Sequence, residues 1–164
     1  MTEKLFVESI EEHSGIIHKI VGMYIDDYTD REDAYQEVVL QAWKSKDSFR
    51  GESKFSTWLY KVALNTVLTA LRKNKKNFST NDYELNIAAE DTSLVKDKYE
   101  VLQMALKSLN EADRSIIIMH LDGFTNPEIA DFMGITINHT NVKIHRIKNK
   151  ITETINKFEN YGMD

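Results

Sequence analysis

The 164-residue sequence contains no cysteine, a single proline and only six glycines. The lack of cysteine excludes disulfides and thiolate metal sites. The five histidines form no HxxxH or HExxH pair, which argues against a zinc site as well. So few helix-breaking residues favour a mostly helical chain with short turns. We therefore expect an all-α fold that holds neither a metal nor another cofactor.

Long apolar runs are also missing. None approaches the roughly 20 residues needed to span a bilayer. The N-terminal stretch MTEKLFVESIEEH places charges among its apolar residues and lacks the apolar centre of a signal peptide. Hydrophobic residues make up 41% and charged residues 29% of the chain, which fits a folded domain or two small ones. We expect a cytoplasmic protein without membrane insertion.

The formal net charge of −5 conceals a sorting of charge along the chain. Residues 1–40 are mainly acidic, whereas residues 41–76 are mainly basic, and a second basic block contains Lys143, Arg146, Lys148 and Lys150. Binding to phosphates depends on the local field at the contact surface rather than on the net charge. Two basic segments therefore keep nucleic acid among the candidate partners.

The chemistry is most concentrated in residues 47–76. A polar loop around Gly51 carries Ser48, Arg50, Ser53 and Lys54. A helix predicted over 57–73, capped by Ser56 or Thr57, buries a face that consists of Leu59, Val62, Ala63, Thr66 and Ala70. A second stripe at helical spacing consists of Trp58, Lys61, Asn65, Thr69 and Arg72. An aromatic ring, cations and an amide suit nucleic acid; the alternative is a solvated face with a half-buried tryptophan.

The preceding part of the chain predicts further helices. One or two helices are expected over 4–28, and Asp30, with Asp33 as its reciprocal partner, is expected to cap a helix over 31–44. Its apolar face would consist of Ala34, Tyr35, Val38, Val39, Ala42 and Trp43. The outward face of this helix would consist of Asp33, Gln36, Glu37, Gln41 and Lys44. This face is either a surface that binds a partner or an ordinary solvent-exposed face.

Residues 77–98 are polar, acidic and weakly periodic. A segment of this length is unusual as a loop within one compact domain, so it is better interpreted as a flexible linker between two domains. The predicted organisation is a first helical domain over 1–76, a linker over 77–98 and a second helical domain over 99–164, which begins with a helix over 99–108.

The last third of the sequence carries strong capping signals. Asn110 with Asp113 begins a helix that runs to Leu121, and Gly123 supplies a left-handed stop. The capping box of Thr125 and Glu128 begins a short helix over 128–133, with Pro127 in its first turn, and Gly134 ends it. Thr136 caps a long helix over 137–158. Two helices joined by such a turn predict a helix-turn-helix.

The long helix has two contrasting faces. Its apolar face consists of Ile137, Thr140, Ile144, Ile147, Ile151, Ile155 and Phe158, in which Thr140 is a mismatch. The opposite face consists of Asn138, His139, Val142, His145, Arg146 and Asn149, flanked by Lys143 and Lys150. Valine packs on thymine methyl groups, and Asn and Arg read base edges, which favours DNA binding. The alternative is an amphipathic helix of a C-terminal bundle.

Two blocks of sequence resemble a known family. DREDAYQEVVLQAW (30–43) followed by FRGESKFSTWLY (49–60) resembles region 2 of extracytoplasmic-function (ECF, group IV) sigma factors. LNEADRSIIIMHLDGFTNPEIADFMGI (109–135) with KIHR (143–146) resembles their region 4. The resemblance implies a region 2 helical bundle and a region 4 helix-turn-helix. It also implies a dissociable subunit that directs bacterial core RNA polymerase to a subset of promoters.

The resemblance also assigns roles by position. The surface that docks on the clamp helices of the largest polymerase subunit matches Asp33, Gln36, Glu37 and Gln41. Residues that capture a flipped −10 base and open the −10 DNA match Ser48, Arg50, Ser53, Lys54, Trp58, Lys61, Asn65 and Arg72. Residues that read the −35 element match Asn138, His139, Val142, Lys143, Arg146 and Lys150. The implied partners are core polymerase, including its flap, promoter DNA, and an anti-sigma factor as a family expectation.

This sequence departs from the family pattern at three places. Leu64 stands where many members carry Arg, and Thr69 stands where an acid is common. Residues 138–141, Asn-His-Thr-Asn, replace a more usual turn into the recognition helix, so the −35 preference does not transfer from relatives.

Two other functions remain as alternatives. A helix-turn-helix regulator with an N-terminal sensor or dimerisation half would bind palindromic duplexes without core polymerase, but it leaves the Trp58 stripe unexplained. A helical phosphate hydrolase would hold a metal through Asp26, Asp27, Asp30 and Asp33, but no phosphate-binding loop accompanies them. The favoured hypothesis is a sigma factor, which binds and does not act as an enzyme.

Overall fold

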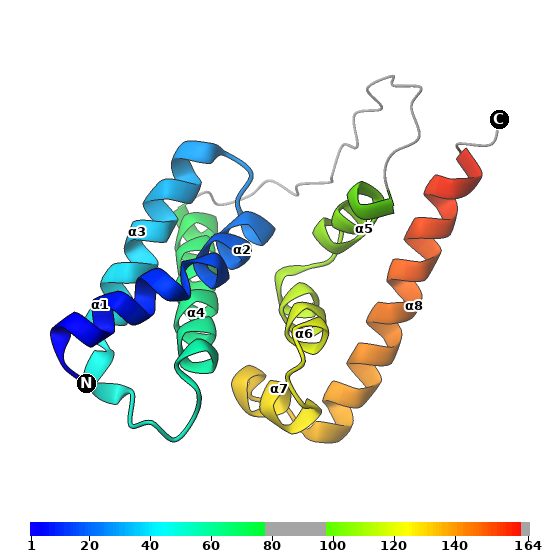
Figure 1. The fold of residues 1–164 in the computed structure, drawn as a ribbon. Coiled ribbons are helices and arrows are strands. Elements are labelled where there is room, and N and C mark those ends of the chain that lie inside the picture. Colours follow the sequence, from blue (N-terminus) through cyan, green and yellow to red (C-terminus); the bar gives the residue numbers. More distant parts are fainter. Residues whose placement is uncertain (78–97, 162–164) are drawn as a thin grey trace. The chain divides into compact units, whose positions relative to one another are not determined.

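A computed structural model describes residues 1–77 and 98–161 of the chain. The described residues form α-helices and one short 3-10 helix, without a strand, which confirms the all-α prediction (Figure 1). The chain divides into two compact domains, residues 1–81 and 82–164. The predicted linker over 77–98 lies outside the described residues except at its ends. No helix in the described ranges is long and apolar enough to cross a membrane.

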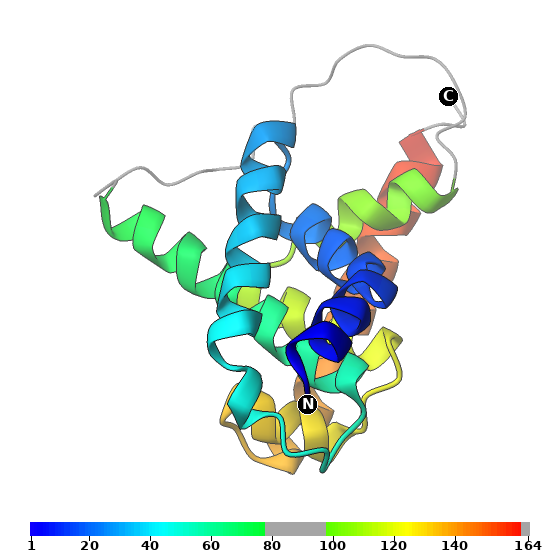
Figure 2. The same ribbon diagram turned by 60° about the vertical axis from the view of Figure 1, so that its left-hand side comes forward.

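The first domain contains α1 (Glu3–Glu12), α2 (Ser14–Tyr24), α3 (Tyr28–Lys44), the 3-10 helix η1 (Lys46–Ser48) and α4 (Phe55–Asn77). Helix α4 packs against both α2 and α3, as the two views show (Figures 1 and 2). Each helix turns an apolar stripe inward, because residues three and four apart share a face. The core contains Ile17, Ile20, Val38, Leu59, Ala63 and Val67.

Helix α3 begins earlier than its sequence predicts. Asp27, not Asp30, is the N-cap, and its carboxylate accepts a hydrogen bond from the backbone N–H of Asp30 at 3.0 Å. The Asp-x-x-Asp spacing occurs twice in succession, and the earlier start lengthens the helix by a turn with a backbone hydrogen bond from Arg31 to Asp27. The Arg31 side chain also donates to the carbonyl of Ile25 at 2.6 Å, which fixes the chain as it enters the helix.

Helix α4 also differs in its start and in its buried face. It begins at Phe55 rather than at Thr57, and the Trp58 N–H donates to the carbonyl of Lys54 at 3.1 Å. The predicted apolar face is too narrow, because the structure also buries Tyr60, Leu64, Val67 and Leu68. Leu64 is only 1% exposed, so its side chain belongs to the core of the domain and is not available to DNA.

The second domain contains α5 (Lys98–Lys107), α6 (Glu111–Leu121), α7 (Asn126–Met133) and α8 (Ile137–Tyr161). Helix α8 packs against the other three (Figure 1). Their shared core contains Ala105, Leu106, Ile116, Ile117, Met119, Ile129, Ile144 and Ile147. Arg114 joins α6 to the end of α5, since its guanidinium donates to the carbonyls of Leu106, Lys107 and Leu109 at 2.6–3.1 Å.

The predicted helix caps of this domain are confirmed. Asn110 accepts from the N–H of Asp113 at 2.8 Å, and Thr125 with Glu128 forms the complete capping box. Gly123 and Gly134 adopt φ values of 87° and 67°, the left-handed conformation that glycine adopts without steric cost. Helix α7 begins at Asn126, two residues before the predicted start, so the predicted helix pair is present with a longer first member.

The apolar face of α8 is largely as predicted, with one correction. Ile144 and Ile147 are buried. Thr140 is completely buried too, and its hydroxyl donates to the Thr136 carbonyl at 3.0 Å. This hydrogen bond within the helix explains how a threonine occupies an apolar position. Ile137 is wrongly placed on this face: its side chain is 49% exposed in the first turn, which precedes the packed part of the helix.

Candidate functional site

The outer face of α3 carries the first predicted surface. Asp33, Gln36 and Glu37 are exposed, and the half-buried Gln41 donates from its amide to the Glu37 carboxylate at 2.7 Å. Leu40, which is not among the predicted residues, lies on the same face and is 44% exposed. Its spacing of three and four residues from Glu37 and Gln36 is the signal that places it there. The face therefore combines acids and amides with one exposed apolar side chain.

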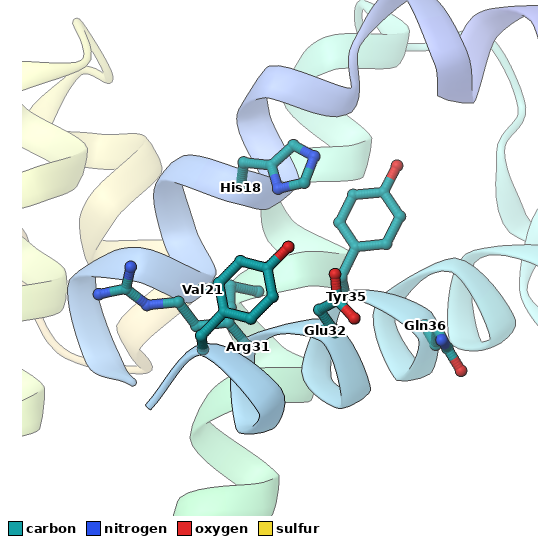
Figure 3. A pocket seen from close by; sticks show the side chains of 7 residues that line it. His18, Val21, Arg31, Glu32, Tyr35 and Gln36 are labelled. Carbon is teal, nitrogen blue, oxygen red and sulfur yellow. The ribbon is translucent and has the colours of Figure 1, made fainter. Parts of the chain in front are cut away.

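A hollow of about 510 Å³ lies between α2 and α3 and adjoins this face at Gln36 (Figure 3). The rings of His18 and Tyr35 stack in it, with their centroids 4.5 Å apart. At its edge, a hydrogen bond from the Tyr28 hydroxyl to Glu32, together with the negative charge of that carboxylate, raises the pKa of Tyr28. The hollow is thus lined by aromatic side chains and a carboxylate, and it lies beside the α3 face.

The loop between η1 and α4 is the second predicted surface. Its tip, residues 50–54, is exposed throughout, and Gly51 adopts a φ of 75°. Ser48, at the start of the loop, donates from its hydroxyl to the Ser45 carbonyl at 2.6 Å. The predicted residues Arg50, Ser53 and Lys54 therefore project from a polar tip at which the backbone is open to a ligand.

The predicted stacking residue Trp58 is packed against other aromatic rings. Its ring lies 5.6 Å from that of Phe49, 5.4 Å from that of Phe55 and 6.1 Å from that of Phe6, measured between centroids. Its indole N–H donates to the Ser48 hydroxyl at 3.4 Å. We call Phe6, Phe49, Phe55 and Trp58 the aromatic cluster. Trp58 is therefore half-buried within the domain, and its position in the cluster fixes the orientation of its ring at the start of α4.

The rest of the predicted stripe runs along α4. Asn65 and Arg72 are exposed, as is Thr69 between them, and Lys61 is half-buried one turn after Trp58. The structure thus brings Lys61, Asn65 and Arg72 onto one side of one helix, which begins directly at the end of the polar loop. This arrangement supplies two cations and an amide along a line that continues from the loop.

The outward face of α8 carries the third predicted surface. Asn138, His139, Arg146 and Lys150 are exposed, and Val142 is 47% exposed among them. His145 and Asn149 lie on the same face by helical spacing, although they are not among the predicted site residues. Both are exposed, and the Asn149 amide lies 3.3 Å from a His145 ring nitrogen. The face offers amides, an exposed apolar side chain and a guanidinium, the groups that read base edges.

Two contacts fix α8 within the domain, and neither was predicted. The Lys143 ammonium forms an ion pair with the Asp113 carboxylate of α6 at 2.9 Å, with both side chains mostly buried. The Asn126 amide of α7 donates to the Asn141 side chain at 2.6 Å. Lys143 therefore differs from the exposed Arg146 and Lys150, because its charge is already paired inside the fold.

Comparison with known proteins identifies the two domains in order. Residues 10–77 match the sequence model of sigma-70 region 2, and residues 99–151 match that of sigma-70 region 4. The first match contains the α3 face, the polar loop and the α4 stripe. The second contains the capping box, α7 and all the site residues predicted on α8. Together the two matches cover most of the chain.

Full-length relatives agree with this assignment. The chain is 26% identical over 168 residues to the ECF RNA polymerase sigma-E factor of Escherichia coli K12. The alignment covers 93% of this chain and 87% of that protein. It is 24% identical over 157 residues to the ECF RNA polymerase sigma factor SigW of Bacillus subtilis. That alignment covers 86% of this chain and 83% of SigW. These alignments extend across both domains.

Solved structures share the fold. The sigma factor RpoE from Bartonella quintana, solved in complex with the anti-sigma factor NepR, superposes with a TM-score of 0.69 at 20% identity over 93% of this chain and 98% of that one. CnrH, solved with the cytosolic domain of CnrY, gives a TM-score of 0.64 at 18% identity over 95% and 90% of the two chains. With both regions matched in order and with full-length relatives of this type, the chain belongs to the ECF sigma factors of RNA polymerase.

Proposed function

We propose that this chain is a group IV sigma factor in which three separate surfaces bind three partners: core polymerase at α3, the −10 element at the polar loop and α4, and the −35 element at α8. The observation that carries the proposal is that each surface is continuous and lies inside one matched region: the α3 face and the loop with α4 in region 2, and the α8 face in region 4. The function consists of binding and requires no bond chemistry.

The α3 face suits docking on core polymerase. Asp33, Gln36 and Glu37 form a row that presents acidic and amide groups to a partner. The hydrogen bond from Gln41 holds the Glu37 carboxylate in place, which reduces the side-chain entropy lost on binding. We propose that this face contacts the clamp helices of the largest subunit, with Leu40 as its apolar contact, and that region 4 contacts the flap.

The polar loop and α4 suit melted −10 DNA. Unpairing a base costs a few kcal/mol, and hydrogen bonding to an extruded base offsets this cost. Arg50, Ser53 and Lys54 supply donors at the loop, and the Ser48 hydroxyl, which donates to the Ser45 carbonyl, supplies an acceptor. Lys61 and Arg72 supply charge for the backbone of the strand along α4. Asn65 lies between these cations, where its amide can meet a base edge.

The α8 face suits duplex −35 DNA. Val142 packs on a thymine methyl group while Asn138, His139 and Arg146 meet base edges, and Lys150 contacts a phosphate. In this proposal Lys143 positions α8 through Asp113. Each domain alone binds modestly. Core polymerase fixes the two domains at the spacing of the two elements, so that the second contact forms at a high effective concentration.

Two of the most similar solved structures were determined with anti-sigma factors or a cytosolic partner domain. We propose that an anti-sigma factor also regulates this chain, and that it acts in the cytoplasm, where core polymerase and promoter DNA are found.

Run-off transcription tests the proposed function. Purified bacterial core polymerase is supplied with fragments of the genome that encodes this protein, with and without the chain. We expect new, specific start sites that require it. A Glu37→Arg variant, with an unchanged circular dichroism spectrum, serves as the control and should reduce these starts by weakening docking. Starts that are the same with and without the chain would contradict the proposal.

The alternative of a helix-turn-helix regulator is not favoured, because region 2 matches as well as region 4. Its signature would be tight binding of palindromic duplex without core polymerase. The hydrolase alternative lacks a structural basis in the ranges that the structure describes, where no three His, Asp or Glu side chains are grouped to hold a metal ion.

A further inference from the structure

We infer that Phe6 of α1 is a positioning residue for the polar loop, residues 49–55, and that α1 is therefore part of the −10 reading apparatus. This inference rests on the function proposed above for the loop. Its evidence is the aromatic cluster, which joins the first helix of the chain to both ends of the loop and to the start of α4.

The loop is closed at its base by two aromatic rings. Phe49 begins it and Phe55 ends it, and their ring centroids lie 5.4 Å apart at an interplanar angle of 87°. Such an edge-to-face arrangement is the favoured geometry for aromatic pairs. The five residues between the two rings are exposed. The position of the tip therefore depends on how firmly its two ends are held.

Trp58 adds a second contact to each end of the loop. Its ring packs on both Phe49 and Phe55, and its indole N–H donates to the hydroxyl of Ser48, which directly precedes Phe49. Because Trp58 lies in the first turn of α4, these contacts fix the loop relative to Lys61 and Asn65, which follow on that helix. The two parts of the proposed −10 surface are thus held in one arrangement.

Phe6 completes this arrangement from α1. Its side chain is 2% exposed, and its ring makes edge-to-face contacts with Phe55, Trp58 and Trp43, with centroids 5.8, 6.1 and 5.7 Å away. Phe6 therefore touches the end of the loop, the start of α4 and the end of α3 at once. Removing the Phe6 ring leaves a cavity next to all three, and the rings of Trp43, Phe55 and Trp58 lose their shared packing contact.

Polar contacts also connect α1 to the segment that enters the loop. The Lys46 ammonium lies 3.8 Å from the centroid of the Trp43 ring and 3.9 Å from the Glu3 carboxylate. The match to sigma-70 region 2 begins at residue 10, beyond Phe6 and most of α1. The matched motif thus contains the loop, whereas the residue that supports the loop from below lies outside it. Pre-organising a binding loop lowers the entropy lost when it binds.

The test compares Phe6→Leu with Leu68→Ala in full-length protein bound to core polymerase. Leu68 is also buried in the first domain, but it lies about 15 Å along α4 from Trp58. Both variants remove buried apolar groups, and thermal unfolding establishes that both remain folded. Loop order is measured by tryptic cleavage after Arg50 and Lys54, identified by mass. Base selectivity is measured by binding of single-stranded oligonucleotides that carry each base at each −10 position of a promoter identified by run-off transcription.

We expect faster cleavage at Arg50 and Lys54 in Phe6→Leu, together with about tenfold weaker binding of the preferred oligonucleotide and a loss of base preference. Leu68→Ala should leave both properties unchanged. Unaltered base preference in Phe6→Leu, or equal effects in Leu68→Ala, would overturn the inference. If the wild-type holoenzyme itself shows no −10 base preference, the proposed function of the loop fails separately, and the cleavage comparison alone decides whether Phe6 fixes the loop.

Discussion

Lys143 has two candidate roles, a contact with −35 DNA and an ion pair within the second domain, and a substitution can distinguish them. The family pattern places it among the cations that contact −35 DNA, but its ammonium lies 2.9 Å from the Asp113 carboxylate. The second oxygen of that carboxylate accepts from the Asn110 amide at 3.1 Å, so the acceptor is itself held in place. We therefore expect Lys143→Met to lower stability but to leave the salt dependence of DNA binding nearly unchanged.

The magnitude follows from burial. The Lys143 and Asp113 side chains are 30% and 19% exposed, between the surface limit of about 0.2–1 kcal/mol and the buried limit of about 3–5 kcal/mol. We expect Lys143→Met to cost about 1–2 kcal/mol, and a double-mutant cycle with Asp113→Asn to return about 1 kcal/mol of coupling. Hydrogen exchange of α8 amides, read by mass spectrometry, reports this loss within the second domain alone.

The salt dependence separates the two roles of a cation. Each phosphate contact contributes about 0.9 to the slope of log K against log salt concentration. In holoenzyme bound to duplex −35 DNA, Lys150→Met should therefore reduce the slope by about 0.9, because Lys150 is exposed and is the residue proposed to contact a phosphate. Lys143→Met should reduce it by much less. Equal reductions in the two variants would refute the reasoning and return Lys143 to the DNA contacts.

Three further predictions concern other parts of the chain. Glu37→Arg should weaken binding to core polymerase at least about tenfold by reversing a charge on the docking face, measured by competition for core; unchanged affinity would remove Glu37 from that face. Glu32→Gln should lower the pKa of Tyr28 toward 10.0, because the Glu32 carboxylate raises that pKa. The change is measured in alkaline solution by the absorbance of the Tyr28 phenolate, and an unaltered titration would contradict the pairing of Tyr28 with Glu32. Thr125→Ala should destabilise the second domain by about 1 kcal/mol through loss of the capping box, measured by hydrogen exchange of α7 amides, whereas unchanged exchange would show that Glu128 caps the helix alone.

The sequence predicted the second domain more closely than the first, for a physical reason. Its helix ends depend on local groups: Asn110, Thr125 and Thr136 cap helices through side chains three residues from their partners, and Gly123 and Gly134 end helices through their own backbone. Such signals are fully present in a short stretch of sequence. In the first domain, two adjacent Asp-x-x-Asp spacings compete, and the sequence alone does not choose between them.

Long-range contacts account for the rest of the differences. Asp113 and Lys143 are 30 residues apart, Asn126 and Asn141 are 15 apart, and Phe6 precedes the matched motif. No periodicity within one helix reveals these partners, because they depend on how the helices pack. The sequence therefore predicted which residues face outward on α3 and α8 but not which of the polar residues, such as Lys143, are already paired.

The pairing of Lys143 also bears on why this domain requires the rest of the polymerase. Of the cations predicted on the α8 face, Arg146 and Lys150 remain exposed. Arg146 is proposed to meet a base edge, which leaves Lys150 as the proposed phosphate contact. One such contact gives a salt slope of about −0.9, so raising salt from about 50 to 200 mM lowers affinity by only about threefold to fourfold, against about 10³–10⁵ for 6–10 contacts. The counterion-release contribution to affinity is correspondingly small. Productive binding then depends on the −10 contacts that core polymerase holds at a fixed distance, and the resulting specificity belongs to the pair of elements rather than to either one.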